Sequence, residues 1–461
     1  MTRIFISLGW PKAHVHSFKR EIRFMDLTGQ NLYRKARRII PGGTQLLSKR
    51  PEMFLPEQWP SYYSKAKGAE VWDLDGRKYV DMSYMGIGAC TLGYADPDVD
   101  KAVHAAIDSG SMTTLNCPEE VELAELLCEL HPWAERVRYA RCGGEAMAAA
   151  VRVARASTGR DRIAFCGYHG WHDWYLAANL ADDSALDGHL LPGLAPAGVP
   201  RGLLGTALPF RYNHLEELEE IVSARGNDLA AVVMEPIRNS EPQPGFLQSV
   251  RSIASRIGAV LIMDEISAGW RLRTGGAHLR YAIIPDMAVF AKAMSNGYAM
   301  AAIIGVAGVM EAFQSTFISS TYWTERVGPA AALATIRKHR RLDVGRCLIE
   351  IGTQIQAGWR AAATRAQLAI TVDGMPPLSH FSFDYDDGQA IRTLFTQIML
   401  GKGFLATNAF YAAHAHQSDH VRDYLEAVEE TFVEIAEAVN RNEVVQRLKA
   451  PIAQTGFCRL A

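Results

Sequence analysis

Residues 229–236, LAAVVMEP, and residues 259–265, AVLIMDE, are two continuous apolar runs, and the segment between them contains LQSVRSIASRIG at 247–258. Apolar runs of about four to eight residues are typical of strands buried on both faces, and the intervening segment has helical periodicity. A strand, a helix and a second strand make the unit from which parallel sheets are built. These residues therefore predict an α/β fold in which helices cover both faces of a mostly parallel sheet.

The same alternation continues toward the N-terminus. It predicts a strand, a helix, a strand and a helix in turn, at 136–142, 145–159, 161–166 and 215–226. Asp75-Gly76 separates two apolar runs, which is a strong signal for a hairpin over 69–83. Amphipathic patterns predict two further helices, at 28–40 and 119–130.

The pattern changes after about residue 336. Three helices are expected around strand-like pieces within 368–385, and they lie at 345–366, 388–402 and 417–442. At 461 residues the chain is too long for one simple core, since cores stop growing at roughly 250–300 residues. We therefore expect four segments: an N-terminal extension (1–27), a segment that contributes to a small domain (28–90), a large domain (91–336) and a C-terminal small α+β domain (337–461).

Composition excludes several classes of function. Lys and Arg number 48 against 50 Asp and Glu, so no global positive field exists to hold nucleic acid or an anionic membrane. No stretch of about 18 apolar residues occurs, so no membrane span is expected. The seven cysteines include no CxxC pair and do not form a disulfide framework. A cytoplasmic location is the natural expectation.

The turn Arg141-Cys142-Gly143-Gly144-Glu145 lies between a predicted strand and a predicted helix. Glycine lets the backbone approach a ligand closely, and the free N–H groups at a helix start favour an anion. The turn is therefore a candidate phosphate cradle. A tight turn with no ligand is the alternative.

Two charged residues follow apolar runs where ligands bind in such sheets. Asp264 ends AVLIMDE, and a buried carboxylate needs a partner such as the protonated ring nitrogen of pyridoxal phosphate. Lys292 is the one lysine in PDMAVFAKAMSNGYAMAAIIG (285–305), an apolar, strand-like segment. Burial lowers the pKa of a lysine and frees its amine to attack a carbonyl. The alternatives are a loop-capping acid and a lysine that reaches solvent from a strand end.

The segment Tyr168-His169-Gly170-Trp171-His172 follows the predicted strand at 161–166. An aromatic ring there can stack on a planar ligand. The two histidines have no third ligand in the pattern, so we expect polar packing rather than a metal site.

Taken in order, these segments resemble the class III aminotransferases of the fold-type-I pyridoxal-phosphate superfamily, most of all the glutamate-1-semialdehyde aminomutase branch. The resemblance covers about residues 30 to 440. The segments that carry it are PGGTQLLSKRP, WDLDGRKYVDMS, RCGGEAMAAAVRVARASTGRDRI, CGYHGWHD, VVMEPI, LIMDEISAGWR, PDMAVFAKAMSNGYAMAAIIG and STYWTERVGPAAALATI.

The resemblance implies that the large domain binds pyridoxal phosphate and that Lys292 holds the cofactor covalently and moves protons at the substrate carbon. It also implies that Asp264 pairs with the pyridine nitrogen. Further cofactor contacts are implied for Gly143, Gly144, Tyr168, Ile266 and Ser267. Thr321 matches a threonine that reaches the phosphate of the neighbouring subunit, which implies a homodimer with shared active sites.

Departures from the family pattern indicate the substrate. The family has Ser-Gly-Thr where Cys142-Gly143-Gly144 stand, and Trp323 begins a bulkier stretch than usual. The carboxylate-binding arginine expected after Pro-Gly-Gly is not in place, although Lys49 and Arg50 lie near it. The arginine expected before Pro377-Leu378 is also missing. Candidate substrate residues are thus Lys49, Arg50, Cys142, Trp323 and Glu235, which matches the family's glutamate before proline.

These replacements suit a hydroxyl-rich ligand, and the variant segments look similar to aminotransferases of aminoglycoside and amino-sugar biosynthesis. The expected reaction is amino transfer from glutamate or glutamine to an oxidised sugar aldehyde or ketone. Three alternatives stay open: an intramolecular aminomutase, an epimerase of an amino-bearing carbon, and a non-catalytic protein on the same scaffold.

Overall fold

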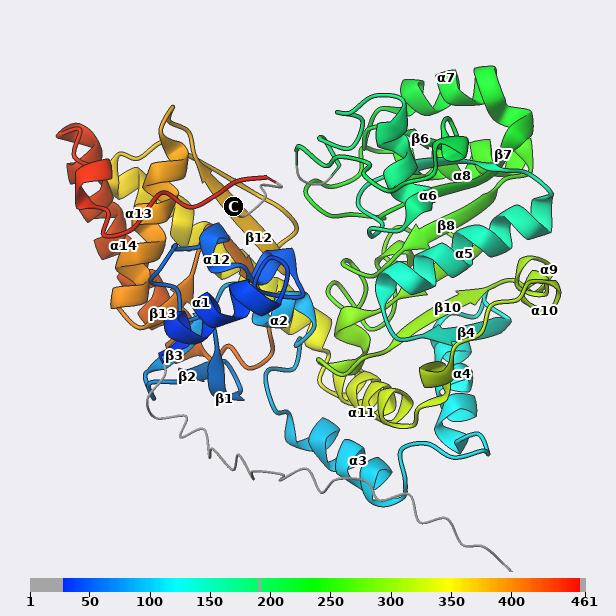
Figure 1. The fold of residues 1–461 in the computed structure, drawn as a ribbon, viewed down its shortest axis with the longest axis horizontal. Coiled ribbons are helices and arrows are strands. Elements are labelled where there is room, and N and C mark those ends of the chain that lie inside the picture. The colour runs from blue at the N-terminus through cyan, green and yellow to red at the C-terminus, as the bar shows by residue number, and fades with distance from the viewer. Residues whose placement is uncertain (1–27, 190–191, 457–461) are drawn as a thin grey trace, which may run out of the picture.

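A computed structural model describes residues 28–189 and 192–456; the expected extension at 1–27 lies outside them. One sheet has seven strands in the order β4-β10-β9-β8-β7-β5-β6 (Figure 1). Its strands are β4 (Arg136–Ala140), β5 (Arg162–Cys166), β6 (Ala207–Pro209), β7 (Leu229–Met234), β8 (Val260–Asp264), β9 (Met287–Phe290) and β10 (Ala301–Gly305). Strands β5 to β9 are parallel to one another, which confirms the mostly parallel sheet.

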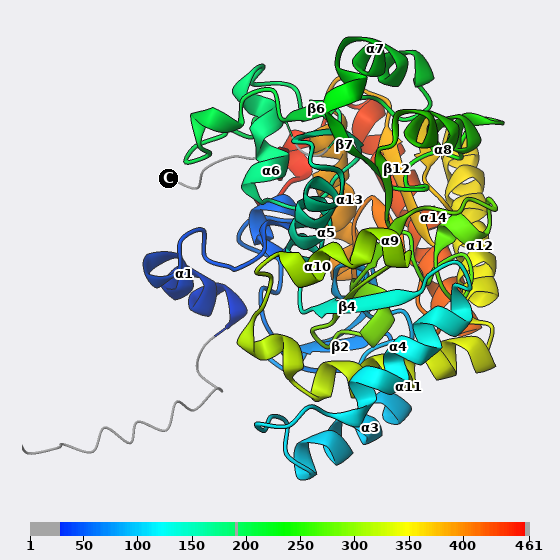
Figure 2. The same ribbon diagram turned by 90° about the vertical axis from the view of Figure 1, so that its right-hand side faces the viewer.

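Helices cover both faces of this sheet because alternate residues of each strand point to opposite sides. Leu261 and Met263 of β8 share a core with one group of helices: α4 (Pro118–Leu130), α7 (Leu215–Arg225), α8 (Phe246–Ile257) and α11 (Val327–Arg341). Val260 and Ile262 share a core with the other group: α5 (Gly143–Thr158), α6 (Asp173–Leu176) and α9 (Ala307–Met310). Both groups can be followed in Figure 2.

A second half is built from both ends of the chain (Figure 1). One of its sheets has the order β1 (Tyr63–Lys67), β2 (Glu70–Asp73), β3 (Lys78–Met82) and β13 (Phe404–Ala406). Strands β2 and β3 form the predicted hairpin, and β13 pairs with β3 in parallel, with Phe404 opposite Val80. A three-stranded sheet completes it, with the order β11 (Ile370–Asp373), β12 (Leu378–Phe383) and β14 (Ala409–Tyr411).

Aromatic side chains form the core of this half. Phe381 of β12 lies 4.8 Å from Trp359 and 5.4 Å from Phe395, measured between ring centroids. These rings come from α12 (Val344–Ala366) and α13 (Gly388–Gly401), and Phe432 joins them from α14 (Ser418–Asn440). The other helices are α1 (Gly29–Ile39), α2 (Met85–Gly88), α3 (Pro97–Asp108) and α10 (Ala312–Ser315). None of the helices in the described ranges is both long and apolar enough to cross a membrane.

One expectation needs correction, and one detail of the sheet is new. The segment around Lys292 is not a continuous strand: β9 ends at Phe290, and Lys292 begins a short 3-10 helix, η8 (Lys292–Ser295). The chain leaves extended structure there because Lys292 itself has a positive φ of 47°, and Asn296 and Gly297, with φ of 48° and 98°, turn it again before β10. In addition, β10 is antiparallel to both β9 and β4, so the sheet is mixed at one edge.

Candidate active site

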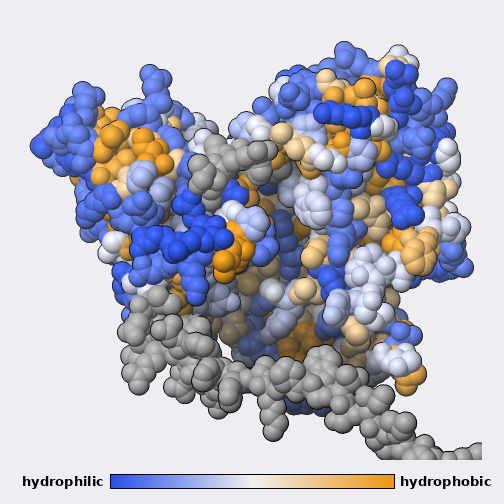
Figure 3. Space-filling model, in the orientation of Figure 1, coloured by the Kyte–Doolittle hydropathy of each residue, from blue (hydrophilic) through white to orange (hydrophobic). Residues whose placement is uncertain are grey.

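The predicted site residues gather at the carboxyl ends of the parallel strands. Tyr168 follows β5, Glu235 follows β7, Asp264 ends β8, and Lys292 follows β9 by two residues. Open α/β sheets bind ligands at this edge. The space-filling view shows a hollow between the two halves of the molecule (Figure 3).

Lys292 is held by a strained backbone and a short hydrogen bond. Its φ is +47°, a left-handed value that a residue with a side chain adopts only at a cost of about 1–2 kcal/mol. Its Nζ donates to Oγ of Ser267 at 2.8 Å. Burial lowers the pKa of Lys292 to about 8, and the charges of Arg238 and Arg271 act in the same direction. A substantial fraction of this amine is thus neutral near physiological pH.

Asp264 is a buried carboxylate with two partners. Its Oδ1 accepts from the backbone N–H of Ile266 at 2.9 Å, and its Oδ2 lies 2.8 Å from Nδ1 of His169. Nε2 of His169 lies 3.1 Å from the carbonyl oxygen of Cys166. His169 thus bridges the Asp264 carboxylate and the Cys166 carbonyl through its two ring nitrogens. His169, which we expected only to pack beside the pocket, therefore holds this carboxylate in position.

The next residue, Glu265, has a purely structural environment. Its carboxylate accepts from the backbone N–H groups of Ala277 and His278 and lies 2.6 Å from Nδ1 of His278. Loop capping, the alternative weighed for the acidic pair, thus describes Glu265 and not Asp264.

The glycine turn begins α5. A Cβ atom on Gly143 would lie 2.8 Å from Cδ1 of Ile266, and one on Gly144 would lie 3.2 Å from the His172 ring. The carboxylate of Glu145 accepts from the backbone N–H groups of Arg141 and Cys142 just before the helix. The turn is therefore closely packed, and its helical N–H groups are placed for an anion.

Glu235 links the β5 and β7 ends of the site. Its Oε2 accepts from the backbone N–H of Tyr168 at 3.3 Å and lies 3.3 Å from Nη1 of Arg238. Gly167, with φ of +109°, lies so close that a Cβ atom there would be 2.7 Å from Oε2. A cavity of about 290 Å³ opens beside Glu235 and Arg238.

The other predicted residues lie on separate elements. Lys49 is exposed in the 3-10 helix η2 (Leu47–Lys49) and lines a cavity of about 640 Å³, while the Arg50 guanidinium packs beside Gly42. Thr321 and Trp323 lie in η9 (Thr321–Thr324), where Thr321 is exposed and Trp323 is partly buried. Cys142 is also exposed. Their roles remain predictions.

Two arginines near Lys292 were not predicted. Arg271 is 1% exposed; its Nε donates to the carbonyl of Ser267 and its Nη2 to that of Gly88, both at 2.6 Å. Arg238 follows β7 by four residues. The sequence offered one sign of these two arginines, since both follow apolar strands. Spacing alone, however, does not show which way a loop side chain points.

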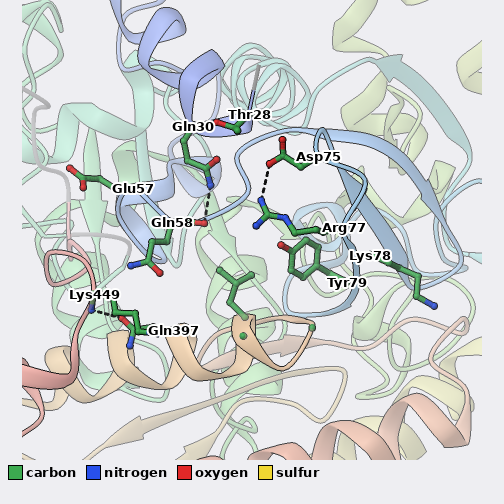
Figure 4. Close-up of a pocket in the computed structure, with 13 residues that line it drawn as sticks. Thr28, Gln30, Glu57, Gln58, Asp75, Arg77, Lys78, Tyr79, Gln397 and Lys449 are labelled. Atoms are coloured by element: carbon green, nitrogen blue, oxygen red, sulfur yellow. Dashed lines mark hydrogen bonds and ion pairs between the residues drawn. The ribbon is translucent and has the colours of Figure 1, made fainter. Parts of the chain in front are cut away.

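A further cavity of about 810 Å³ lies in the other half of the molecule, lined by Gln30, Arg77 and Lys449 among others (Figure 4). The Arg77 guanidinium there is paired with Asp73 and Asp75. None of the predicted site residues lines this cavity.

Known proteins resemble the chain over most of its length. The model of the class-III aminotransferase family matches residues 56–409. The chain belongs to this family. Class-III aminotransferases work with pyridoxal phosphate, so the predicted fold, enzyme class and cofactor are confirmed.

Three curated relatives differ in substrate. The chain is 30% identical to a 3-aminobutyryl-CoA aminotransferase of Cloacimonas acidaminovorans, with 88% of this chain and 96% of the relative covered. It is 32% identical to a glutamate-1-semialdehyde 2,1-aminomutase of Methanothermobacter thermautotrophicus (88% and 99%). It is 29% identical to a 2'-deamino-2'-hydroxyneamine transaminase of Streptomyces kanamyceticus (80% and 89%).

The fold also matches solved structures. The PLP form of the FumI protein from Sphingopyxis sp. MTA144 superposes with a TM-score of 0.81 at 25% identity, with 92% of this chain and 99% of that chain covered.

The residues present fit pyridoxal phosphate. A lysine amine with a lowered pKa, a buried carboxylate for a ring N–H and a glycine turn for a phosphate all converge here. Gly143 and Gly144 begin α5 without side chains, so a phosphate could approach the backbone N–H groups of its first turn.

Proposed function

We propose that this aminotransferase moves an amino group from glutamate or glutamine to the aldehyde or ketone of an oxidised sugar or aminoglycoside. The observation that carries the proposal is the cavity of about 640 Å³, which is lined by Tyr62, Tyr84, Tyr94, Ser48 and Lys49 among others. Aromatic faces cover the apolar face of a sugar ring, and hydroxyl groups bind its polar rim. The transaminase of Streptomyces kanamyceticus supports the same substrate class.

The cavity connects to Lys292 through a short chain of contacts. Tyr84 meets Tyr411 edge-on at 5.1 Å between ring centroids, and the Arg271 guanidinium lies 5.9 Å from the Tyr411 ring. Nε of Arg271 donates to the carbonyl of Ser267, whose hydroxyl accepts from Lys292. These contacts link the wall of the cavity to Ser267, which binds the Lys292 amine.

In this proposal Lys292 holds the cofactor and carries the proton at the substrate carbon, and Ser267 orients its amine. Asp264, fixed by His169, would accept a hydrogen bond from the cofactor's ring nitrogen. When bound, pyridoxal phosphate supplies the electron sink. The backbone of Gly143 and Gly144 holds the phosphate, while Tyr168 and Ile266 hold the ring between them.

The proposal extends to the assembly. Thr321 of one subunit reaches the phosphate site of its neighbour, which makes a homodimer with shared active sites in the cytoplasm. Its exposure in η9 leaves it available for such a contact. Cys142 and Trp323 are proposed to contact the substrate. The proposed division into domains is that of the four segments predicted from the sequence.

A half-reaction screen tests the proposal. The holoenzyme is loaded with glutamate or glutamine, and oxidised sugars are scored by their ability to restore the aldehyde absorbance of the cofactor. Restoration by a sugar carbonyl supports the proposal; a preference for a CoA thioester or glutamate semialdehyde contradicts it. Turnover that needs no external amino donor would indicate an aminomutase.

A second experiment tests Lys292. Borohydride should attach the cofactor to this residue, as found by peptide mapping, and Lys292→Ala should fold but lose all transfer. A label on another lysine, or retained turnover, would show that Lys292 does not have this role.

A further inference from the structure

The loop after β7 joins the two halves of the molecule. The carbonyl of Arg238 accepts from the backbone N–H of Met375 at 3.3 Å, and that of Asn239 accepts from Gly374 at 3.0 Å. The segment 374–378 reads GMPPL and has no basic side chain. The backbone of Arg238 is therefore fixed against the small half, directly beside a stretch that supplies no cation.

The Arg238 guanidinium is anchored on one side only. Within 28–189 and 192–456, its hydrogen bonds are those of Nη1 to Oε1 and Oε2 of Glu235, at 3.4 and 3.3 Å. Charge-assisted pairs commonly measure about 2.7–2.9 Å, so this pair is loose. The side chain is 35% exposed. Its remaining N–H donors can therefore meet a ligand without first breaking a protein contact.

Arg238 and Lys292 follow parallel strands, β7 and β9, at the same edge of the large sheet, and their charges interact. Arg238 lowers the pKa of Lys292, and it also lowers the pKa of His380, although burial has the larger effect on both. Its own pKa is raised, chiefly by Glu235 and further by Tyr411 and Asp264. Arg238 thus stays charged, within electrostatic reach of the residues proposed to hold the cofactor ring.

Other nearby cations are less open to a ligand. Arg271 is only 1% exposed, and its Nε and Nη2 donate to two backbone carbonyls, which leaves Nη1 as its one nitrogen without a partner in the described residues. Arg211 lines the same 290 Å³ cavity as Arg238, but its backbone N–H and its Nε both donate to Glu217, at 2.7 and 2.5 Å. Lys49 lines the other cavity. Arg238 is the cation of this group that combines an open side chain with proximity to Lys292.

We propose that Arg238 binds the carboxylate of the amino-acid donor. This rests on the proposed function, since it assigns the residue that recognises the donor at the same site. A planar guanidinium offers two parallel N–H groups to two carboxylate oxygens, a geometry that lysine cannot reproduce. Glu235 holds Arg238 through one edge and leaves the other edge for the donor.

The test follows the donor half-reaction of the holoenzyme with L-glutamate by cofactor absorbance. Arg238→Ala and Arg238→Gln should raise the KM for glutamate about 10- to 100-fold, the factor expected for losing a charge-assisted hydrogen bond. Arg238→Lys should give an intermediate value. Arg211→Ala is the matched control, because it removes an arginine of the same cavity and should leave the KM within about twofold of the wild type.

A binding measurement checks the assignment without turnover. Glutarate, which has the carboxylates but no amine, should bind the wild-type holoenzyme in calorimetry and bind Arg238→Gln at least about tenfold more weakly. The cofactor content of each variant is measured alongside. If the variants keep the wild-type KM, or lose kcat with KM and glutarate affinity unchanged, the assignment is wrong.

The outcome is separable from that for the sugar acceptor. If no sugar accepts the amine but the glutamate half-reaction depends on Arg238, the proposed acceptor is wrong and the proposed role of Arg238 is supported. If sugars are aminated but the Arg238 variants bind glutamate and glutarate normally, the proposed acceptor is supported and the proposed role of Arg238 is wrong.

Discussion

Replacing Lys292 by methionine measures how much free energy the fold loses by burying this amine. The pKa of Lys292 is about 8 in the folded protein, against an ordinary value of 10.5. That difference corresponds to roughly 3 kcal/mol, which opposes folding while the amine is protonated. Methionine fills a similar volume and has no charge. The cofactor-free Lys292→Met protein should therefore be more stable than the cofactor-free wild type by roughly this amount at pH 7.

The sign of the pH dependence follows from the lowered pKa. Below about pH 8 the Lys292 amine is mostly protonated in the folded and the unfolded state. The free energy of unfolding of the wild type is then lowered by the full cost of burying the charge. Between about pH 8 and 10.5 the unfolded chain binds more protons than the folded one, so the stability of the wild type rises. The gap between the two proteins should narrow through this window and level off above it.

Equilibrium denaturation of both cofactor-free proteins from pH 7 to 10.5 gives these values. Lys338→Met is the control, because its amine pairs with Asp96 and Asp98, and hydrogen bonds to these carboxylates raise its pKa. Its removal should destabilise the protein. A difference in free energy of unfolding between Lys292→Met and the wild type of under about 1 kcal/mol at pH 7 would show that burial of the amine does not destabilise the fold in this way. A difference that does not change with pH would show the same.

Two further predictions concern the residues around Lys292. His169→Phe should weaken pyridoxal-phosphate binding about 10- to 100-fold in a fluorescence titration, because Asp264 loses its side-chain hydrogen-bond partner; an unchanged affinity would show that His169 only packs. Gly167→Ala should lower the free energy of unfolding by at least about 1 kcal/mol more than Gly110→Ala. Both glycines have positive φ, but only at Gly167 would the added Cβ atom meet a neighbour, Oε2 of Glu235 at 2.7 Å. Equal losses in urea denaturation would contradict the steric argument.

The sequence predicted the large sheet well because its strands are buried on both faces. LAAVVM and VLIMD contain only apolar residues up to the final aspartate, and β7 and β8 begin and end within two residues of the expected positions. The hairpin around Asp75-Gly76 was equally local, since the turn residues themselves fix its geometry. Features set by neighbouring residues were therefore readable.

Features that depend on distant segments were not readable. The antiparallel direction of β10 depends on the turn after Lys292 and on pairing with β4, about 165 residues earlier. His169 and Asp264 are 95 residues apart, so their hydrogen bond arises only when β5 and β8 end at the same edge of the sheet. For Arg238, the sequence shows an arginine after a strand, but only the contact with Met375 fixes where that loop lies.

The parallel pairing of β13 with β3 also constrains how the protein is made. Val80 leaves the ribosome roughly 320 residues before its partner Phe404, which at about 5–20 residues per second is a delay of roughly 16–65 s. During that time β3 has one open edge, and every strand of the seven-stranded sheet is synthesised before β13. Newly made chains should therefore carry a folded large half and an unpaired N-terminal hairpin, which is the species most exposed to chaperones and to mispairing with another chain.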